Sequence, residues 1–387
     1  MIMKRKAVLW VAGFSVLVVA VLVFVAVLTV YVDPFFHYHE PRTDEFYYPL
    51  NNQRSQSDGI VKHFDYQGII TGTSMTENFR TTEAYGLFEY RFVKVPLSGA
   101  TFKEINDLLE TALNANPDLR IIIRGLDISR LGNDPNLMRT DLGEFPTYLY
   151  DDDPFNDVNY LFNRDVVFNR VYPMIRDRNN PDIGTGVTHF NEYSSWMNEK
   201  AWVFGRKSLY PDGVTMEEPR YHPEMLDIDM NTVRQNVRQN VAALAGAWPD
   251  VTFYCFFTPY SAKWWQMELE GMRLDQQIEA ERVAIEELLK YDNIRLFSFN
   301  NLTNITTDLN NYKDATHYGD WINSLILRYM YDGKCLLTAE NYEAQLEQER
   351  QFYSAFDYTL LNDQEDYEDD SLAAQLLYDE IYTFPEE

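Results

Sequence analysis

The sequence predicts an α/β protein with one open parallel sheet, tethered to a membrane by an N-terminal helix. Apolar, strand-like runs recur at residues 68–71, 91–95, 119–124, 251–257 and 294–299, and helical patterns alternate with them. Such alternation is typical of parallel sheets that are covered by helices. Ahead of the first run, residues 7–32 form a stretch of 26 residues without a charge.

The N-terminal stretch predicts a single membrane span. About 20 apolar residues cross a bilayer as a helix, and residues 7–32 exceed that length. Lys4, Arg5 and Lys6 precede the stretch, and basic residues favour the cytoplasmic side. We therefore expect residues 1–32 to be a cytoplasmic basic stub with an uncleaved signal-anchor, and the rest to be extracytoplasmic. A cleaved signal peptide is the alternative, although its apolar region is usually only about 7–15 residues long.

Composition restricts the class of partner. The chain has 60 Asp and Glu against 33 Lys and Arg, a formal net charge of −27. A negative surface repels nucleic acid and anionic polymers, so we expect no nucleic-acid partner and favour a neutral or cationic one. The alternative is that the charge serves only solubility. Two cysteines, Cys255 and Cys335, are too few for a disulfide scaffold.

The chain divides into four predicted parts. Residues 1–32 are the anchor, and the polar and aromatic residues 33–60 form a stalk or a packed arm. The α/β domain covers residues 61–340 and carries an insertion at about 128–227. Residues 341–387 form a helix and an acidic tail, in which an apolar cluster permits a short docked helix.

Aromatic residues in and after the insertion are candidate substrate-binding residues. Long loops in compact domains are often functional, and aromatic rings can line a groove for a sugar. The candidates are Trp196, Trp202 and Tyr210 in the insertion and Trp264 after the fourth strand. The alternative is that these rings form a satellite core under the insertion.

A serine follows the first predicted strand. The run Ile-Ile-Thr-Gly-Thr-Ser-Met, residues 69–75, indicates a buried strand that passes into a helix with Ser74 at the turn. A helix start offers unpaired amides that favour negative charge. Near the end of the α/β pattern, Asp314 and His317 are three residues apart. A serine nucleophile needs such a base and orienting carboxylate. Each piece alone also occurs as turn chemistry or by chance.

A capping box supports a second contributor to this site. Residues 101–104 read Thr-Phe-Lys-Glu ahead of an apolar helical pattern, which places Gly99 just before a helix N-terminus. Two later helices are expected around residues 233–248 and 274–288. In open parallel sheets, ligands bind beyond the carboxyl ends of the strands. Ser74, Gly99 and His317 are all expected at that edge.

The order of these motifs resembles the SGNH (GDSL-like) hydrolase and acyltransferase superfamily. In that family a first block carries the serine, a second a glycine, a third an asparagine and the last an Asp-x-x-His. Here Ser74 stands in the first block, Gly99 in the second, and Asp314 with His317 in the last. The third block differs from the family pattern, because Asp127 stands at the asparagine position. An ionised carboxylate cannot donate a hydrogen bond to an oxyanion.

The resemblance is greatest to a membrane-anchored bacterial cell-surface subgroup, related to teichoic-acid D-alanine transfer proteins and polysaccharide O-acetyltransferase domains. It implies a three-layer, flavodoxin-like SGNH fold, oxyanion contacts from the Ser74 and Gly99 amides, and no cofactor. The implied function is a serine esterase or O-acyltransferase acting on acyl groups of a cell-envelope glycan or polymer. The alternative is a catalytically silent accessory protein that binds a surface glycan or assists a membrane acyltransferase. The histidines lack metal-ligand spacing, so no metal is expected.

Overall fold

The structure is a computed structural model of the chain. It describes every residue except 1, 142–143, 152, 199–201, 211–227 and 368–387. The chain forms two compact units: an anchor unit of residues 1–64 and 145–189, and a sheet unit of residues 65–144 and 190–387. The apolar cluster of the predicted acidic tail lies outside the described residues.

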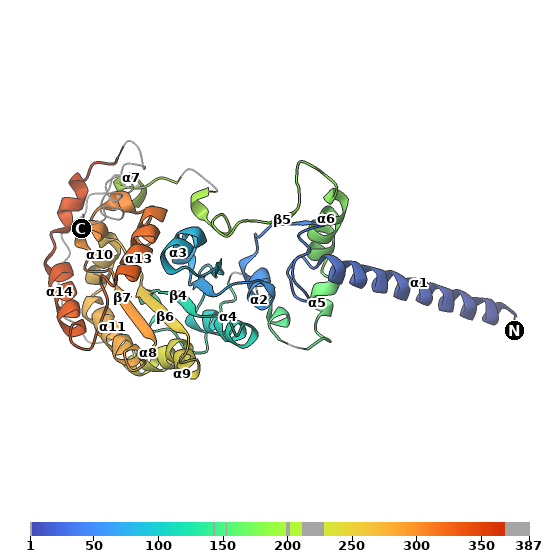
Figure 1. Cartoon of the computed structure of the whole chain (residues 1–387), viewed down its shortest axis with the longest axis horizontal. Helices are drawn as coiled ribbons and strands as arrows, with labels where there is room; N and C mark the ends of the chain where they lie inside the picture. The colour runs from blue at the N-terminus through green and yellow to red at the C-terminus, as the bar shows by residue number, and fades with distance from the viewer. Residues whose placement is uncertain (1, 142–143, 152, 199–201, 211–227, 368–387) are drawn as a thin grey trace. The chain divides into compact units, whose positions relative to one another are not determined.

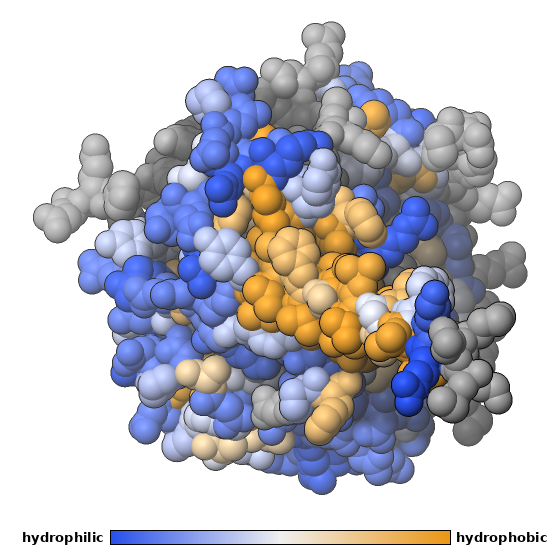
Figure 2. Space-filling model, turned by 90° about the vertical axis from the view of Figure 1, so that its right-hand side faces the viewer, coloured by the Kyte–Doolittle hydropathy of each residue, from blue (hydrophilic) through white to orange (hydrophobic). Residues whose placement is uncertain are grey.

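Helix α1 (Ile2–Val32) is the long N-terminal element of the anchor unit. Its large apolar side chains are exposed around the helix, and Trp10, for example, is 69% exposed. A helix that is apolar on all sides suits lipid rather than water. Figure 2 shows its hydrophobic side chains at the centre of the view. Within the described part of the chain, α1 is the one helix long and apolar enough to cross a membrane. The side of the membrane on which the rest lies stays a prediction.

The last turn of α1 belongs to the core of the anchor unit. Thr29 and Val32 are fully buried, and the Tyr48 hydroxyl donates a hydrogen bond to the Val32 carbonyl at 2.7 Å. One residue further on, the buried carboxylate of Asp33 accepts a hydrogen bond from the Tyr160 hydroxyl at 2.7 Å. These bonds fix α1 to both sequence segments of the unit.

Short elements make up the remainder of the anchor unit. Strand β1 (Tyr47–Tyr48) pairs in parallel with β5 (Gly186–Val187). The helical elements are α2 (Gln53–His63), η3 (Thr147–Leu149), α5 (Val158–Leu161), η4 (Val166–Val171) and α6 (Tyr172–Asp177). Residues 33–60 are therefore packed into this unit together with part of the predicted insertion.

The sheet unit contains five parallel strands in the order β3-β2-β4-β6-β7. They are β2 (Gly68–Thr71), β3 (Phe92–Lys94), β4 (Ile121–Leu126), β6 (Thr252–Phe257) and β7 (Ile294–Ser298). All six residues of β4 are buried, as expected for a central strand covered on both faces. The predicted α/β class with a central parallel sheet is confirmed.

Helices cover both faces of this sheet. Helix α3 (Thr81–Phe88) contacts α13 (Asp320–Asp332), and α8 (Met230–Val237) contacts both α4 (Phe102–Ala115) and α11 (Leu274–Leu288). Figure 1 shows α3 and α13 on one side of the strands and α4, α8 and α11 on the other. The other helical elements are η2 (Ile128–Arg130), η5 (Trp196–Asn198), α7 (Arg206–Leu209), η6 (Arg238–Ala242), α9 (Ala243–Ala247), α10 (Ala262–Glu270), α12 (Thr303–Thr306), η7 (Leu309–Asn311), α14 (Tyr342–Ala355) and η8 (Tyr358–Asp363).

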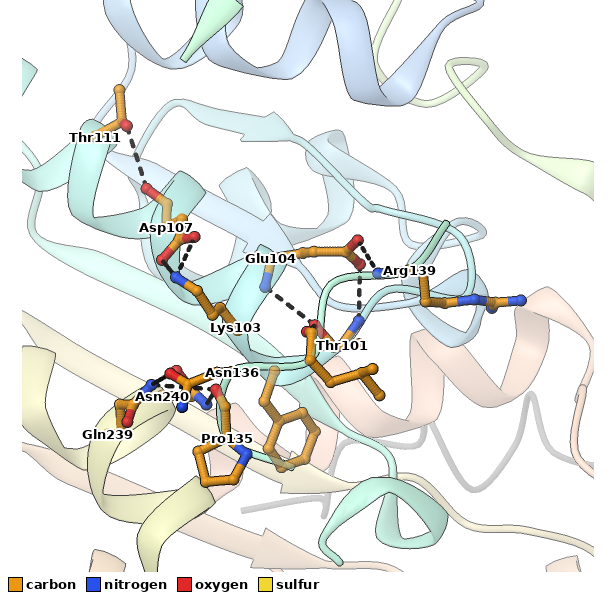
Figure 3. A network of polar contacts seen from close by, with 12 residues as sticks. Thr101, Lys103, Glu104, Asp107, Thr111, Pro135, Asn136, Arg139, Gln239 and Asn240 are labelled. Atoms are coloured by element: carbon orange, nitrogen blue, oxygen red, sulfur yellow. Dashed lines mark hydrogen bonds and ion pairs between the residues drawn. The ribbon is translucent and has the colours of Figure 1, made fainter. Parts of the chain in front are cut away.

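Helix α4 begins at the predicted capping box. The Thr101 hydroxyl accepts a hydrogen bond from the Glu104 amide at 3.3 Å, and the Glu104 carboxylate accepts one from the Thr101 amide at 2.9 Å. Glu104 also accepts a bond from the Arg139 amide at 2.9 Å (Figure 3). The cap therefore fixes both the start of α4 and the loop that follows η2.

Strand order places the candidate residues at one edge of the sheet. Strand β2 lies between β3 and β4, so the chain moves first to one side of β2 and then to the other. Parallel α/β sheets bind ligands beyond the strand ends at such a switch point. Ser74 follows β2 and Asp127 follows β4, so both lie at the carboxyl ends of these two neighbouring strands.

Candidate functional site

The turn that carries Ser74 is tight. Gly72 has a φ of +151°, and a Cβ atom there would lie 2.6 Å from the Thr76 methyl group. Thr73 caps the next turn by accepting a hydrogen bond from the Met75 amide, and the Thr76 hydroxyl donates to the Thr73 carbonyl at 2.9 Å. These local bonds close a short turn directly after the strand.

The expectation of a helix start at Ser74 is wrong in one respect. Ser74 begins η1 (Ser74–Thr76), a single 3₁₀ turn, and the next α-helix, α3, starts only at Thr81. One turn of three residues has no aligned series of peptide dipoles comparable to that of a long helix. Stabilisation of negative charge at Ser74 therefore depends on individual donors.

A loop before α13 presents the base and its orienting carboxylate. Residues Tyr312 and Tyr318 form an antiparallel bridge, and the Lys313 amide donates to the His317 carbonyl at 3.0 Å. Asp314 accepts a hydrogen bond from the His317 amide at 2.8 Å. The loop thus holds Asp314 and His317 together through its backbone as well as through their side chains.

The three side chains form a continuous hydrogen-bonded relay. Ser74 Oγ lies 2.8 Å from His317 Nε2, and His317 Nδ1 lies 2.8 Å from Asp314 Oδ2. An ionised carboxylate only accepts hydrogen bonds, so Nδ1 carries the proton and Nε2 has the free lone pair. This arrangement lets His317 accept the Ser74 proton. The structure brings together the three residues that were chosen from the sequence.

The electrostatics support an ionised Asp314. Partial burial raises the pKa of Asp314, but the hydrogen bonds from His317 and Thr316 outweigh burial and lower the pKa below its usual range. The Asp314 side chain is 48% exposed and that of His317 is 25% exposed. The relay is therefore reachable by a substrate while the carboxylate remains charged.

Gly99 lies in the loop beside the Ser74 turn. The Leu97 amide donates to the Gly72 carbonyl at 2.9 Å, which joins the two loops. Gly99 has a φ of +63°, a left-handed conformation that favours glycine, and it precedes the cap of α4 by two residues. Arg139 Nη1 donates to the Gly99 carbonyl at 2.7 Å. The carbonyl is thereby held on the arginine, and Gly99 remains a candidate amide donor.

Asp127 is buried at the end of β4. Its carboxylate accepts a hydrogen bond from the Thr73 hydroxyl at 2.7 Å, and Thr73 directly precedes Ser74. Arg130 Nε lies 3.5 Å from the same oxygen. Burial raises the pKa of Asp127, although its hydrogen bond to Thr73 and the charges of Arg130 and His317 oppose this effect. A carboxyl group that retains its proton can donate a hydrogen bond, which the ionised form cannot.

Trp196 is the predicted aromatic residue that lies against the relay. Its ring centroid is 6.2 Å from that of His317, with the two rings perpendicular. Lys313 Nζ lies 4.0 Å from the Trp196 ring centroid and 3.8 Å from that of Trp202. A cation between two indole rings is favourable, so Lys313 fixes this aromatic pair beside His317.

Tyr210 and Trp264 have a different environment. Each is 7% exposed. Lys263 Nζ lies 4.7 Å from the Tyr210 ring centroid, and the Trp264 ring contacts Tyr260 at 4.9 Å. These contacts belong to α10 and the residues that precede it. The four predicted aromatic residues therefore form two groups, of which Trp196 and Trp202 lie on the side of His317.

Lys94 was not among the site residues predicted from the sequence. It is the last residue of β3, it is fully buried, and its Nζ donates a hydrogen bond to the Glu77 carbonyl in the segment after η1. Burial lowers the pKa of Lys94 to about 7. The signal was present, because a lysine stands within the apolar run Phe-Val-Lys-Val. A buried amine near the serine turn holds the segment that follows it.

The described residues were compared with the ligand sets of metal ions and with the requirements of a reactive thiol. Among the described residues, no group of three or more His, Cys, Asp and Glu side chains could hold a metal ion. Both cysteines are free, and burial raises the pKa of Cys255 to about 12. A thiol with so high a pKa is a poor nucleophile.

Comparisons with known proteins were made on sequence and on structure. No family model matches the chain, and no curated protein matches it. One solved structure is similar, described as that of a "putative platelet activating factor from Streptococcus pneumonia". The likeness has a TM-score of 0.38 and 9% identity, and it covers 73% of this chain and 90% of that chain. A TM-score this low does not establish a shared fold.

Proposed function

We propose that this protein is a membrane-tethered, extracytoplasmic serine esterase or O-acyltransferase of the SGNH type, acting in a bacterial cell envelope. The observation that carries the proposal is the relay from Ser74 Oγ through His317 to Asp314, with both steps at 2.8 Å. The strand order supports the finer fold assignment, because it corresponds to the flavodoxin-like order 2-1-3-4-5. The serine lies at the switch point of that order.

The proposed reaction begins with proton transfer. His317 Nε2 accepts the Ser74 proton as Oγ attacks the ester carbonyl carbon, and the carbonyl electron pair moves to oxygen. Asp314 holds the imidazolium that forms. The tetrahedral oxyanion is stabilised by the Ser74 and Gly99 amides and by the protonated form of Asp127. When the carbon–oxygen bond of the leaving alcohol breaks, His317 returns the proton to it, which leaves an acyl-serine.

The second half-reaction distinguishes the two activities. Attack by water on the acyl-serine gives hydrolysis, and attack by a glycan hydroxyl gives transfer. His317 takes the proton of either acceptor and returns it to Ser74 Oγ as the bond between Oγ and the acyl carbon breaks. Trp196 is only 7% exposed and Lys313 lies against both indole rings, so the half-buried Trp202 is the ring of this pair that a sugar can contact. The net charge of −27 favours a neutral or cationic acceptor over a polyanion. An acylated cell-surface glycan or polymer is the proposed substrate.

The decisive test is covalent labelling of Ser74. The full chain in detergent is exposed to a fluorophosphonate and analysed by peptide mass spectrometry, with Ser74→Ala alongside. The matched control is Ser354→Ala, a serine on α14 whose hydroxyl donates to the Gln351 carbonyl. We expect an adduct on Ser74 in the wild type and in Ser354→Ala, and none in Ser74→Ala. Turnover of an acyl ester should fall by about 10³ to 10⁶ in Ser74→Ala.

A second candidate is a catalytically silent accessory protein that binds a glycan or assists a membrane acyltransferase. It is favoured by Asp127 at the position where the family has an asparagine donor. No adduct on Ser74, under conditions that label a known serine esterase, would favour this candidate. So would glycan binding that is equal in the wild type and in Ser74→Ala.

A further inference from the structure

Exposed apolar side chains are concentrated in one segment of the anchor unit. Outside α1, thirteen large apolar residues are exposed among the described residues, and six of them lie between residues 155 and 183. Phe155 is 87% exposed and Phe168 is 64% exposed. The other four are Val158, Phe162, Tyr172 and Ile183. Exposed apolar groups gathered in this way usually mark an interaction surface.

This segment is attached to the end of the membrane helix. The Thr29 hydroxyl in the last turn of α1 donates to the Leu161 carbonyl at 3.3 Å. Both α5 and η4 contact α1. Figure 1 shows α5 and α6 beside the end at which α1 enters the unit. All of these elements belong to the anchor unit, so their depth in the bilayer is determined by the depth of α1.

The depth can be estimated from the helix rise. A hydrocarbon core about 30 Å thick takes up about 20 helical residues, which extend from residue 7 to about residue 26. Thr29 then lies about 4 to 5 Å beyond the core. The headgroup layer on each side is about 5 to 8 Å thick. The segment bonded to Thr29 is therefore at the level of the headgroups.

The composition of the segment fits that layer. Val158 begins α5 and Phe162 directly follows it, whereas Phe168 lies in η4 and Tyr172 begins α6. Residues 155–172 contain two arginines and two aspartates, a net charge of zero in a chain whose net charge is −27. Aromatic rings mixed with arginines are typical of segments that lie in the membrane interface.

We propose that residues 155–172, the interfacial segment, form a second membrane contact beside α1. The side chains of Phe155, Phe162 and Phe168 enter the boundary between headgroups and acyl chains of the leaflet at which α1 ends. The ligand is the lipid surface itself. This contact holds the anchor unit against the bilayer at a fixed depth, rather than leaving it to swing on a single helix. It does not depend on whether Ser74 is catalytic.

The test measures depth in a bilayer. The full chain carrying Cys335→Ser, with Cys255 buried, is given one new cysteine and an environment-sensitive fluorophore. It is reconstituted into vesicles of phosphatidylcholine and phosphatidylglycerol that contain lipids with a nitroxide near the headgroup or, for residue 16, lipids with a nitroxide deep on the acyl chain. The test positions are Phe155→Cys and Phe168→Cys. Val16→Cys in α1 controls for insertion, and Leu360→Cys, an exposed leucine of the sheet unit, is the water-exposed control.

We expect several-fold stronger quenching at residues 155 and 168 than at residue 360. Quenching at residue 16 together with water-like values at both 155 and 168 would overturn the proposal while leaving the anchor intact. Absence of quenching at all positions, residue 16 included, would overturn both the anchor and the second contact. Circular dichroism of each labelled chain verifies folding, and the test residues are exposed, so replacing them removes few packing contacts.

Discussion

At the residue scale, the position of one proton on the His317 ring determines what the relay can do. Asp314 accepts from Nδ1 at 2.8 Å, and this keeps the Nε2 lone pair directed at Ser74. A carboxamide in place of the carboxylate could present its NH₂ group to Nδ1 and stabilise the other tautomer. The relay geometry would then be retained with the wrong ring nitrogen protonated.

Asp314→Asn should therefore lower kcat by about 10³ to 10⁴ with little change in KM, because the proton acceptor is lost but the binding surface is not. Steady-state hydrolysis of an acyl ester measures both constants. Asp320→Asn is the matched control, since Asp320 pairs with Arg80 at 2.8 Å outside the relay. A wild-type rate in Asp314→Asn would contradict the proposed role of Asp314.

Asp127 predicts a pH effect of defined sign. Because burial raises its pKa, Asp127 keeps its proton to higher pH than an ordinary aspartate. Donation to the oxyanion is available while the proton is present and is lost as the pH rises through the folded-state pKa. An asparagine donates at every pH. We expect kcat/KM of the wild type to fall as the pH rises through that pKa, and we expect Asp127→Asn to remain active without this fall. Identical pH profiles of the wild type and Asp127→Asn would show that Asp127 does not donate to the oxyanion.

At the element scale, local pattern and local capping were enough to predict much of the sheet unit. The apolar runs predicted strands within about two residues of their observed bounds, and the helix expected at residues 274–288 is α11. Helix α2 was not foreseen, because its buried residues include Gln56, Ser57 and Asp58 rather than an apolar stripe. Gln56 accepts from the Asn51 and Asn52 amides and Asp58 pairs with Lys62, and an apolar periodicity does not register such polar contacts.

The candidate site, too, could be predicted from the sequence only in part. Ser74, Asp314 and His317 could be chosen from the order of their motifs. The contact of Trp196 with His317 and the bond from Thr73 to Asp127 join residues 121 and 54 positions apart, and no local pattern encodes such pairs. Likewise, nothing in the sequence around Lys313 indicates that its amine contacts two indole rings.

The capping box of α4 predicts a stability effect. Thr101→Ala removes the hydroxyl that accepts from the Glu104 amide, so we expect a loss of about 1 to 2 kcal/mol in the free energy of unfolding. Thr111→Ala is the control on the same helix, where the hydroxyl donates only to the Asp107 carbonyl (Figure 3). Urea denaturation of the detergent-solubilised chain gives both values. An equal loss in the two variants would show that capping is not the cause.

Two buried glutamates link α11 to α14. Asn300 Nδ2 donates to Glu281 at 3.1 Å and to Glu349 at 3.0 Å, and both glutamates are almost fully buried. Burial raises the pKa of each carboxyl group. Above the ordinary glutamate pKa of about 4.3, the unfolded chain ionises freely and the folded chain does not. The free energy of unfolding should therefore decrease as the pH rises.

Glu349→Gln keeps the hydrogen-bonding shape of the side chain and removes one titrating group. We expect its urea midpoint to decrease less between acidic and mildly alkaline pH than that of the wild type. Glu347→Gln on the exposed side of α14 serves as the control and should follow the wild type. A parallel pH dependence in Glu349→Gln would mean that the pair does not titrate in this range.

At the scale of the whole molecule, the anchor helix is also part of a folded core. Val32 is fully buried, and Phe35 and Phe36 just after it are at most 4% exposed. A chain that starts at residue 25 keeps this packing, whereas one that starts at residue 37 loses two buried phenylalanines. Loss of a buried phenylalanine side chain typically costs about 3 to 5 kcal/mol.

We therefore expect the chain starting at residue 37 to be cleaved rapidly by protease within residues 145–189, while the chain starting at residue 25 resists. Limited proteolysis followed by mass spectrometry locates the cleavage. Residues 190–367 provide the internal control, because they belong to the sheet unit in both chains. Equal resistance of both chains within residues 145–189 would show that the anchor unit does not need the last turn of α1.

The division of the anchor unit into two sequence segments has a consequence for biogenesis. Residues 65–144, an 80-residue stretch of the other unit, separate its halves. At about 5 to 20 residues per second, the ribosome needs roughly 4 to 16 s to make that stretch. In the proposed extracytoplasmic topology, Phe35 is outside the translocon during this interval without Tyr160, the ring of the second segment that stacks on it. In that topology, export requires a chaperone or the bilayer itself to shield the Phe35 ring until the second segment arrives.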